Sequence, residues 1–305
     1  MNTLTNKIDF AMIISAKNAN PNGDPLNGNR PRENYDGFGE ISDVCIKRKI
    51  RNRLQDMGQA IFVQSDERRT DGYRSLRERA DGCIELKLLS EDKEKYAKFS
   101  CEKWIDVRSF GQVFAFKKSS GKKSKKNIAN ETDEDVVSDD DNSVSIGIRG
   151  PVSIHSAVSV SPIEISSMQI TKSVNGETGK DPDKKSADTM GMKHRVDFGV
   201  YVIYGSINTQ LATKTGFSDE DSKLIKQALI TLFENDCSSA RPDGSMEVCK
   251  LYWWKHNSQL GQYSSAKVHR SLKVEPIVDI PKKLEDYSIT NAELEGLLPE
   301  IYDGI

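Results

Sequence analysis

The fold is decided by IDFAMIISAKNANPNGDPLNGNRPRENYDGFGEISDVCIKRKIRNRLQDMG, residues 8–58. Residues 8–16 are apolar and β-prone, which predicts a first strand. Residues 17–40 are dense in Asn, Gly and Pro and exceed the length of an ordinary structureless loop, which indicates a functional loop. Ser42 is a suitable N-cap for a helix that follows it, and Gly58 is placed to end that helix.

The remaining segments, taken outward from this stretch, alternate between strand and helix patterns. We expect mixed helices over 66–103 and strand character over 104–116 and 144–165. A hairpin follows over 166–196, and its returning strand runs to 209. After it we expect a helix from Ser218 to near Asn235, a strand over 247–254 and a short helix over 291–298. The order strand, helix, strands, helix, strand predicts an α+β fold with an RRM-like (ferredoxin-like) sheet and insertions.

The composition narrows the classes of function. The chain has 305 residues with a net charge of −2, so a nucleic-acid surface must be a local patch. No apolar stretch is long enough for a membrane helix, and we expect a cytoplasmic protein. The five cysteines and four histidines show no metal-binding spacing, and there is no Walker A or Rossmann motif. We therefore expect no metal, no cofactor and no catalytic residue.

The helix predicted after Ser42 carries a basic face. Its buried stripe is formed by Ile46, Ile50, Leu54 and Met57. Lys47 and Arg51 lie four residues apart, so they share a face beside that stripe, and Arg48 is adjacent. The spacing of these cations suits contact with phosphates. The alternative is a solvent-facing surface on which the aliphatic parts of the lysine and arginine side chains cover the core.

The preceding loop is a second candidate for binding. The backbone amides of Asn22 and Gly23 are suited to a close approach by phosphate or ribose, and Arg30 and Arg32 add charge-assisted hydrogen bonds. The alternative is an ordinary long turn. Asp24 in the same loop is a candidate for catalysis, as a metal ligand or a base, although an acid after Asn-Gly is more often a turn residue. His194 beside Lys193 is a second candidate, as an RNA-cleaving base, but no second histidine or other partner can be assigned to it.

The hairpin over 166–196 suggests a protruding arm. Its candidate contacts with a nucleic-acid strand are Lys180, Lys184, Met190, Lys193 and His194, because lysines meet phosphates and an apolar side chain can wedge between bases. The alternative is a surface loop without a role. Residues 117–143 join a lysine-rich run to an acidic run, so no core can form there and we expect a charged flexible loop.

Several blocks of sequence occur together in a characteristic order: NANPNGDPLNGNRPR, SDVCIKRKIRNRL, DVRSFGQVFA, RGPVSI, TMGMKHRVDFGVYVIYGSIN, TGFSDED and LYWWKHNSQLG. They cover about residues 8–58, 100–116 and 146–275. In this wording and order the chain resembles the guide-RNA-coating backbone subunit of type I-C CRISPR complexes, in the Csd-two branch of the Cas-seven family.

The resemblance implies a non-catalytic subunit that polymerises along the crRNA spacer and leaves bases free to pair with target DNA. Its partners would be crRNA, target DNA, copies of itself and other Cascade subunits, namely the Cas-five-type and large subunits. An alternative within the superfamily is a metal-dependent ribonuclease that uses Asp24. The implied parts are a discontinuous palm (1–60 and 104–290), an inserted helical finger region (61–103), a thumb hairpin (166–196) and a C-terminal tail (291–305).

Matched motifs also carry over residue roles. The loop residues Asn20, Asn22 and Gly23, the helix cations Lys47, Arg48 and Arg51, and Arg108 with Gln112 would hold the guide backbone. Met190, Lys193 and His194 would belong to the thumb. The charged residues near 219–221 are candidates for contact between subunits.

Overall fold

The computed structural model describes residues 2–116, 144–172 and 190–305. The described chain is built on one antiparallel sheet of eight strands, two of which, β7 (Val152–Ile154) and β9 (Ile165–Thr171), pair with its longest member outside the main path. In spatial order, the main path is β14 (Glu300–Asp303), β11 (Met246–Lys255), β1 (Ile8–Ala19), β10 (Met190–Ile207), β8 (Ala157–Pro162) and β4 (Phe38–Ile41). The α+β class is confirmed.

Strand β1 is central because its residues are apolar on both faces. It pairs with β10 on one side and β11 on the other, and its first nine residues are buried. Phe10 stacks on Trp253 with ring centroids 5.6 Å apart and lies over Gly205 of β10. A Cβ added at Gly205 would lie 2.1 Å from the Phe10 ring, so glycine is required there. The predicted first strand is confirmed and continues to Ala19.

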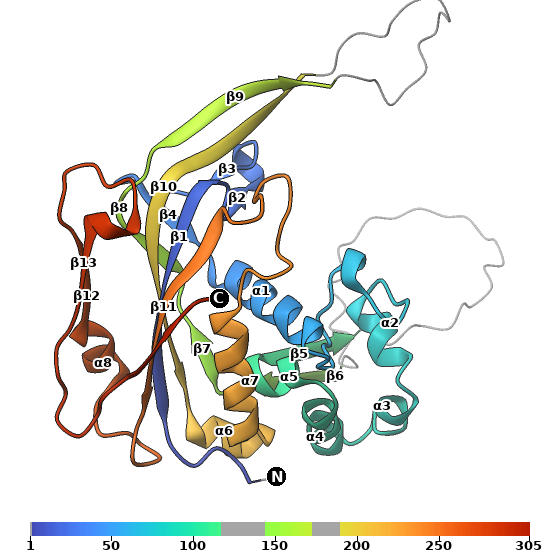
Figure 1. Cartoon of the computed structure of the whole chain (residues 1–305). Helices are drawn as coiled ribbons and strands as arrows, with labels where there is room; N and C mark the ends of the chain where they lie inside the picture. The colour runs from blue at the N-terminus through green and yellow to red at the C-terminus, as the bar shows by residue number, and fades with distance from the viewer. Residues whose placement is uncertain (1, 117–143, 173–189) are drawn as a thin grey trace, which may run out of the picture.

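Helices α1 (Asp43–Asp56) and α7 (Asp219–Ile230) cover one face of the sheet and share its main core (Figure 1). Both begin where the sequence predicted. Ser42 accepts a hydrogen bond from the Cys45 amide, and Ser218 forms a reciprocal capping box with Asp221. The opposite face is covered by α8 (Ser265–Ser271) and by the pair of strands β12 (Leu272–Pro276) and β13 (Tyr287–Asn291). The short helix η3 (Leu284–Asp286) lies between these two strands in the chain.

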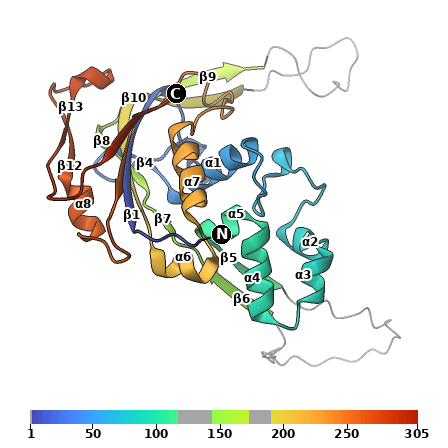
Figure 2. The same ribbon diagram turned by 60° about the horizontal axis from the view of Figure 1, so that its bottom comes forward.

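The inserted helices have a core of their own beside the sheet (Figure 2). It is formed around Phe62, Trp104 and Phe114. The elements are η2 (Asp66–Arg68), α2 (Leu76–Asp81), α3 (Ile84–Leu88), α4 (Lys93–Lys103), α5 (Ile105–Phe110) and the two-stranded sheet of β5 (Gly111–Phe116) and β6 (Val144–Arg149). The predicted helical character of 66–103 is confirmed.

Residues 105–110 correct the prediction of strand character over 104–116. They form α5, and the strand begins only at Gly111. The carboxylate of Asp106 is fully buried and accepts hydrogen bonds from the amides of Phe62 and Val63, at 2.8 and 3.0 Å. These partners lie about forty residues earlier, so local pattern did not reveal them. Gly111 ends the helix at φ +81°, where an added Cβ would lie 2.2 Å from the carbonyl oxygen of Ile148.

The C-terminal segment is a second correction. The predicted helix over 291–298 does not form; a tight turn with a bridge between Leu294 and Leu297 precedes β14, which pairs with the edge of β11. Gly296 adopts φ +70°, and Pro299 lacks an amide hydrogen for a helix. The segment called a tail is thus part of the main sheet. Helix α7 also ends at Ile230 rather than near Asn235, and α6 (Thr209–Thr215) was not predicted.

The predicted loop over 17–40 is more structured than expected. It contains the end of β1, the pair β2 (Gly23–Asp24) and β3 (Arg30–Pro31), the turn η1 (Pro25–Asn27) and most of β4. The predicted hairpin is confirmed in its two strands: β9 pairs with the first half of β10, from Met190 to Val196. They form an arm that projects from the sheet (Figure 1). Residues 117–143 and the hairpin tip lie outside the described residues.

Among the described residues, no helix is both long and apolar enough to cross a membrane. All five cysteines are free thiols, and three of them, Cys83, Cys101 and Cys249, are buried. Burial raises the pKa of Cys101 and of Cys249 to about 11, which keeps both thiols protonated at neutral pH. These two residues therefore act as apolar core side chains.

A buried polar cluster links β1 to β11 and α8. The Asp9 carboxylate, with no exposed surface, pairs with His256 Nε2 at 2.8 Å and with Lys7 Nζ at 3.0 Å. His256 Nδ1 accepts a hydrogen bond from the Gln262 amide at 2.9 Å, so its proton lies on Nε2, which donates to Asp9. His269 Nε2 donates to the carbonyl of Gly205 at 3.1 Å. The cluster fixes α8 against the sheet.

This cluster predicts a loss of stability in mild acid. Burial lowers the pKa of His269 below its ordinary value, so the folded state prefers the neutral ring. Above about pH 6.5 the ring is neutral whether the chain is folded or not; below it, the unfolded chain takes up the proton first and folding weakens. We expect the melting temperature to fall between about pH 7.5 and about pH 5.5, and His269→Gln to reduce that fall. The control is His194→Gln on the arm. If the melting temperature of His269→Gln fell with pH as much as that of the control, His269 would not be the source of the acid sensitivity.

Candidate nucleic-acid interface

The β2–β3 loop, residues 20–32, is held in shape by its own asparagines. Asn20 Nδ2 donates to the carbonyl of Asn29 at 2.7 Å, and Asn22 Oδ1 accepts from both the amide and the hydroxyl of Ser42 at 2.9 Å. Gly23 packs so closely that an added Cβ would lie 2.0 Å from Asn29 Oδ1. The predicted residues Asn20, Asn22 and Gly23 are thus brought together, and their contacts position the loop beside the start of α1.

The two loop arginines differ in their contacts. Arg32 Nη2 lies 3.4 Å from Asp24 Oδ1, which also accepts the Leu26 amide at 3.2 Å. Arg30 Nη1 donates to Ser167 Oγ of β9 at 3.3 Å, across a sequence separation of 137 residues. Both arginine side chains remain partly exposed, at 33% for Arg30 and 39% for Arg32. The structure therefore joins the predicted loop to the predicted arm, with cations at the junction.

The arm presents two different faces. Side chains of directly paired residues in an antiparallel sheet lie on the same face, and alternate residues of one strand share a face. Met190, Met192 and His194 therefore lie on one face, where Ser167 Oγ is 2.7 Å from His194 Nδ1. Lys193 lies on the other face, paired with Met168. Four apolar side chains of the arm are exposed by at least 38% of their surface: Met168, Ile170, Met190 and Met192.

A third segment, residues 236–245 between α7 and β11, completes this region and was missed by the sequence analysis. The amide of Asn20 donates to the carbonyl of Ala240 at 2.9 Å, and the amide of Lys17 donates to the carbonyl of Ser245 at 2.8 Å. In Figure 1 the segment lies beside β2 and β3, above α1. The turn residues Arg-Pro-Asp-Gly at 241–244 mark a turn, but no local signal places that turn against residue 20.

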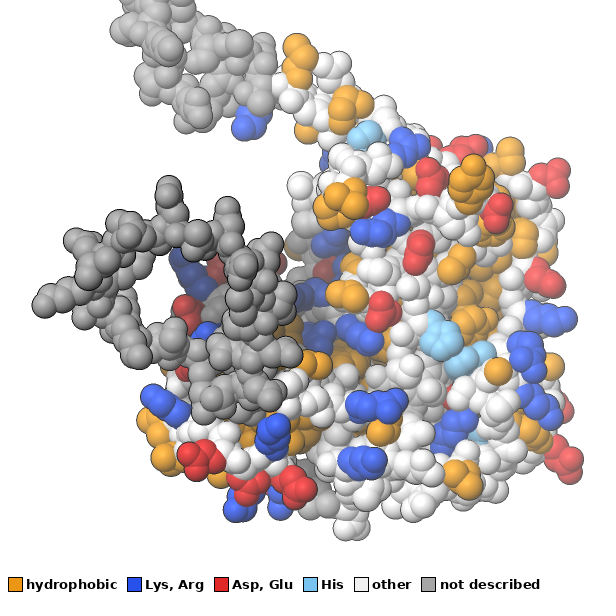
Figure 3. Space-filling model, turned by 180° about the vertical axis from the view of Figure 1, so that it is seen from behind, with side chains coloured by type: hydrophobic (Ala, Val, Ile, Leu, Met, Phe, Trp, Pro, Cys, Tyr) orange, Lys and Arg blue, Asp and Glu red, His pale blue; other side chains and the backbone are white. Residues whose placement is uncertain are grey.

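We call these three parts the candidate interface: the β2–β3 loop (20–32), the base of the arm (165–168 and 193–197) and the segment 236–245. Seen from behind, lysine and arginine side chains gather along the hollow below the arm, with a few carboxylates between them (Figure 3). The three parts carry five lysine or arginine side chains and four aspartates, and exposed apolar side chains lie at one end on the arm. Cations beside exposed apolar side chains are suited to a nucleic-acid backbone with unstacked bases.

Comparison with known proteins decides the family. The family model described as CRISPR-associated protein Cas7 matches residues 6–292. The chain belongs to the Cas7 family. A curated relative, the CRISPR-associated protein Cas7 of Haloferax volcanii, is 27% identical over 247 residues, which cover 78% of this chain and 67% of the relative.

Two solved structures are similar to this Cas7 chain at lower identity. A chain of a CRISPR RNA-guided surveillance complex in a pre-nicking state is 14% identical, with a TM-score of 0.43, covering 81% of this chain and 78% of that one. A chain of another CRISPR RNA-guided surveillance complex is 13% identical, with a TM-score of 0.42, covering 81% and 68%.

The basic face of α1 is more internally paired in this Cas7 chain than the sequence analysis expected. Arg51 Nε lies 3.1 Å from the buried Asp106 carboxylate, and its side chain is only 13% exposed. Lys47 Nζ is 3.0 Å from Asp43, and Arg48 donates to a backbone carbonyl beyond the helix. These cations link α1 to its surroundings, and the side chains of Lys47 and Arg51, at 25% and 13%, are less exposed than those of the loop arginines.

Arg108 and Gln112 lie apart from the candidate interface. Arg108 makes a two-point contact with Asp221, at 3.1 and 2.7 Å, in which its side chain is 17% exposed and that of Asp221 is 6% exposed. Asp221 also closes the capping box of α7, so this pair fixes α5 to α7 and leaves Asp221 almost entirely buried within the subunit. Gln112 Nε2 donates to the carbonyl of Val113 at 3.0 Å. Lys180 and Lys184 lie outside the described residues.

Asp24 is placed as a turn residue. It caps η1, and the guanidinium of Arg32 beside it repels a second cation. Within residues 2–116, 144–172 and 190–305, no group of three or more His, Cys, Asp or Glu side chains is arranged to hold a metal ion. Asp24 is thus engaged by the turn and by Arg32.

Proposed function

We propose that this Cas7 protein is a non-catalytic backbone subunit of a type I-C CRISPR interference complex in the cytoplasm. Copies polymerise along the crRNA spacer, hold its phosphate backbone and leave bases free to pair with target DNA. The Cas-five-type and large subunits complete the complex. The observation that carries the proposal is the convergence of the β2–β3 loop, the base of the arm and the segment 236–245 on one surface.

The fold supports the division into palm, fingers and thumb. If the arm and the outer strands are set aside, the sheet order β11–β1–β10–β8, with α1 after β1 and α7 after β10, is that of a doubled split βαβ unit, as in RRM-like domains. We infer that this unit is the palm, that residues 61–103 with their separate core are the fingers, and that the arm is the thumb.

The interface chemistry favours RNA held without sequence preference. Arg30, Arg32 and Lys193 provide charge for phosphates, which carry no sequence information. The exposed methionines on the arm, Met190 and Met192, are suited to lie against unstacked bases, because apolar side chains insert between bases without selecting them. A subunit that coats spacers of any sequence needs this combination.

Size measurement tests the proposal. The purified chain, mixed with an unstructured single-stranded RNA, is expected to form assemblies whose mass grows in steps of one subunit as the RNA is lengthened, and whose affinity falls steeply with salt. RNA of unrelated sequence should assemble equally well. Mass spectrometry under native conditions measures the steps; a constant mass at every RNA length would rule out a backbone subunit.

The same mixture, incubated with magnesium, tests the ribonuclease alternative. Because Asp24 is ion-paired with Arg32, we expect the RNA to stay intact with both the wild-type protein and Asp24→Ala. Periodic cleavage by the wild-type protein that disappears in Asp24→Ala would establish the nuclease instead.

A further inference from the structure

The segment 236–245 brings one more cation to the candidate interface. It contains a turn in which the Ser238 amide donates to the carbonyl of Arg241 at 2.8 Å and the Arg241 amide donates back at 3.1 Å. The neighbouring Ala240 carbonyl accepts from Asn20, so the turn is fixed against the end of β1. Arg241 is therefore held next to the β2–β3 loop, although the two segments are far apart in the sequence.

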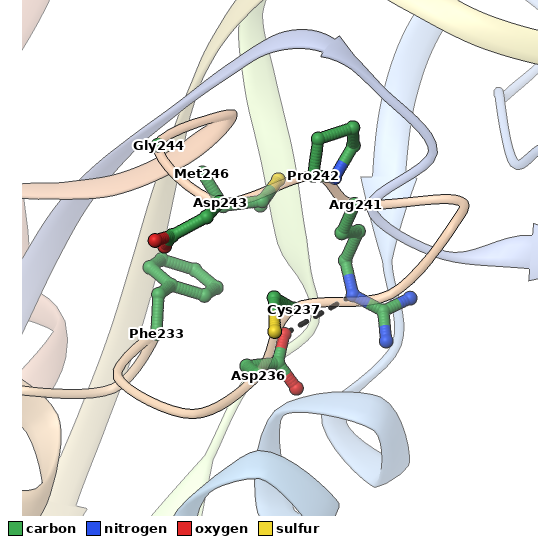
Figure 4. Close-up of a pocket in the computed structure, with 8 residues that line it drawn as sticks. All are labelled: Phe233, Asp236, Cys237, Arg241, Pro242, Asp243, Gly244 and Met246. Carbon is green, nitrogen blue, oxygen red and sulfur yellow. Dashed lines mark hydrogen bonds and ion pairs between the residues drawn. The ribbon is translucent and has the colours of Figure 1, made fainter.

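The Arg241 side chain is anchored along only one edge. Its Nε donates to Asp236 Oδ2 at 3.1 Å, and the same oxygen is ion-paired with Lys49 of α1. Lys49 is 5% exposed and lies over the Phe233 ring, 5.4 Å from its centroid. Figure 4 shows the two terminal nitrogens of Arg241 directed away from Asp236. A guanidinium has five N–H donors, and among the described residues only the one on Nε has a partner.

The pocket beside Arg241 leaves no room for a ligand of its own. Its accessible volume is about 10 Å³, the space of about one water molecule, between Phe233, Cys237, Pro242 and Met246. Any group bound by Arg241 must therefore lie outside the pocket, on the free edge of the guanidinium, where the side chain keeps 26% of its surface exposed.

The charged groups around Arg241 come from α1 and from the segment 236–245. Asp236 holds Arg241 and Lys49 through one oxygen, and Asp243, which lines the same pocket, is a second nearby carboxylate. The Cys45 thiol of α1 contacts the carbonyl of Pro21, so the start of α1 and the β2–β3 loop lie together here. Because Asp236 is shared by two cations and bonds only Nε of Arg241, the outer edge of the guanidinium keeps two donor nitrogens for an anion.

We propose that Arg241 binds a phosphodiester of the guide RNA, and that Lys49 and Asp236 are positioning residues that fix its guanidinium. This inference rests on the proposed function. The guanidinium of Arg241 donates to Asp236 through Nε, and its two terminal nitrogens can donate two parallel hydrogen bonds to one phosphate. A lysine has a single ammonium group and cannot make both contacts in the same way.

The test compares Arg241→Gln with Arg270→Gln, which removes the same charge from the exposed surface of α8. Binding of an unstructured RNA oligonucleotide is titrated over a range of salt. We expect Arg241→Gln to bind about tenfold more weakly, and the slope of log K against log salt to become less steep by about 0.7, the value for one phosphate contact on a single strand. Arg241→Lys should recover only part of the affinity, and Arg270→Gln should match the wild type.

A second measurement uses the unmodified protein, so it does not depend on the variants folding. Phenylglyoxal, which modifies accessible arginines, should label Arg241 and Arg270 in the free protein and only Arg270 when RNA is bound. Wild-type affinity and slope in Arg241→Gln, or unprotected Arg241, would overturn the inference and leave the proposed function standing. A loss of self-association without RNA would assign Arg241 to a protein contact instead. A wild-type protein that does not bind RNA would overturn the proposed function itself.

Discussion

Replacing Asp106 by alanine is expected to destabilise the protein by about 3–5 kcal/mol, as for other buried ion pairs broken on one side. The carboxylate has no exposed surface, lies 3.1 Å from Arg51 and accepts the amides of Phe62 and Val63. Its removal leaves a largely buried guanidinium and two amides without their partner. Asp106 of α5 contacts α1, which belongs to the main core, and the chain at residues 62–63, which belongs to the core of the inserted helices. Its loss therefore weakens the contact between the two cores.

Unfolding in denaturant measures this loss: the denaturant concentration at the midpoint should fall, while the dependence of the free energy of unfolding on denaturant stays the same. The matched control is Asp81→Ala, which removes a carboxylate that is 63% exposed and 3.5 Å from Arg77 within one helix. Exposed pairs of this kind contribute about 0–1 kcal/mol. If the two variants lost equal stability, Asp106 would not be the link between the sheet and the inserted helices.

The second large effect concerns RNA. Arg30→Gln together with Arg32→Gln is expected to weaken RNA binding about 100-fold at low salt, at about 1.4 kcal/mol for each charge-assisted contact. Both side chains are partly exposed on the loop that touches the arm, and their contacts within the protein are long, at 3.3 to 3.8 Å. The contacts to protein are therefore weak, and the charges remain available to phosphate.

The control for this pair is Arg270→Gln with Lys273→Gln, which removes two exposed positive charges from α8 and β12, on the other face of the sheet. Equal affinity of the two double variants would show that net charge, and not the loop, governs binding. Fluorescence anisotropy at several salt concentrations gives both the affinity and the number of phosphates contacted. Thermal unfolding of each variant checks that the fold is kept.

Features set by neighbouring residues were predictable from the sequence. The apolar run of β1, the caps of α1 and α7 and the two strands of the arm depend on residues a few positions apart. Features set by distant partners were not. Helix α5 depends on amides forty residues earlier, and the C-terminal segment becomes a strand because the edge of β11 is free to pair with it.

The candidate site shows the same division. The residue types of the loop and the arm indicated nucleic-acid binding, but their junction through Arg30 and Ser167 spans two distant segments. The basic pattern of α1 did not show that Arg51 faces the buried Asp106 or that Lys49 faces Asp236. Charge patterns in sequence give the sign of a surface, whereas the distant carboxylates decide which cations remain free.

Ultraviolet cross-linking of the wild-type protein to single-stranded RNA, followed by mass spectrometry of the peptides, tests the RNA-binding surface most directly. We predict cross-links in residues 17–32, at the base of the arm and in 236–245. Cross-links confined to α8 and the β12–β13 hairpin, on the opposite face of the sheet, would contradict the account.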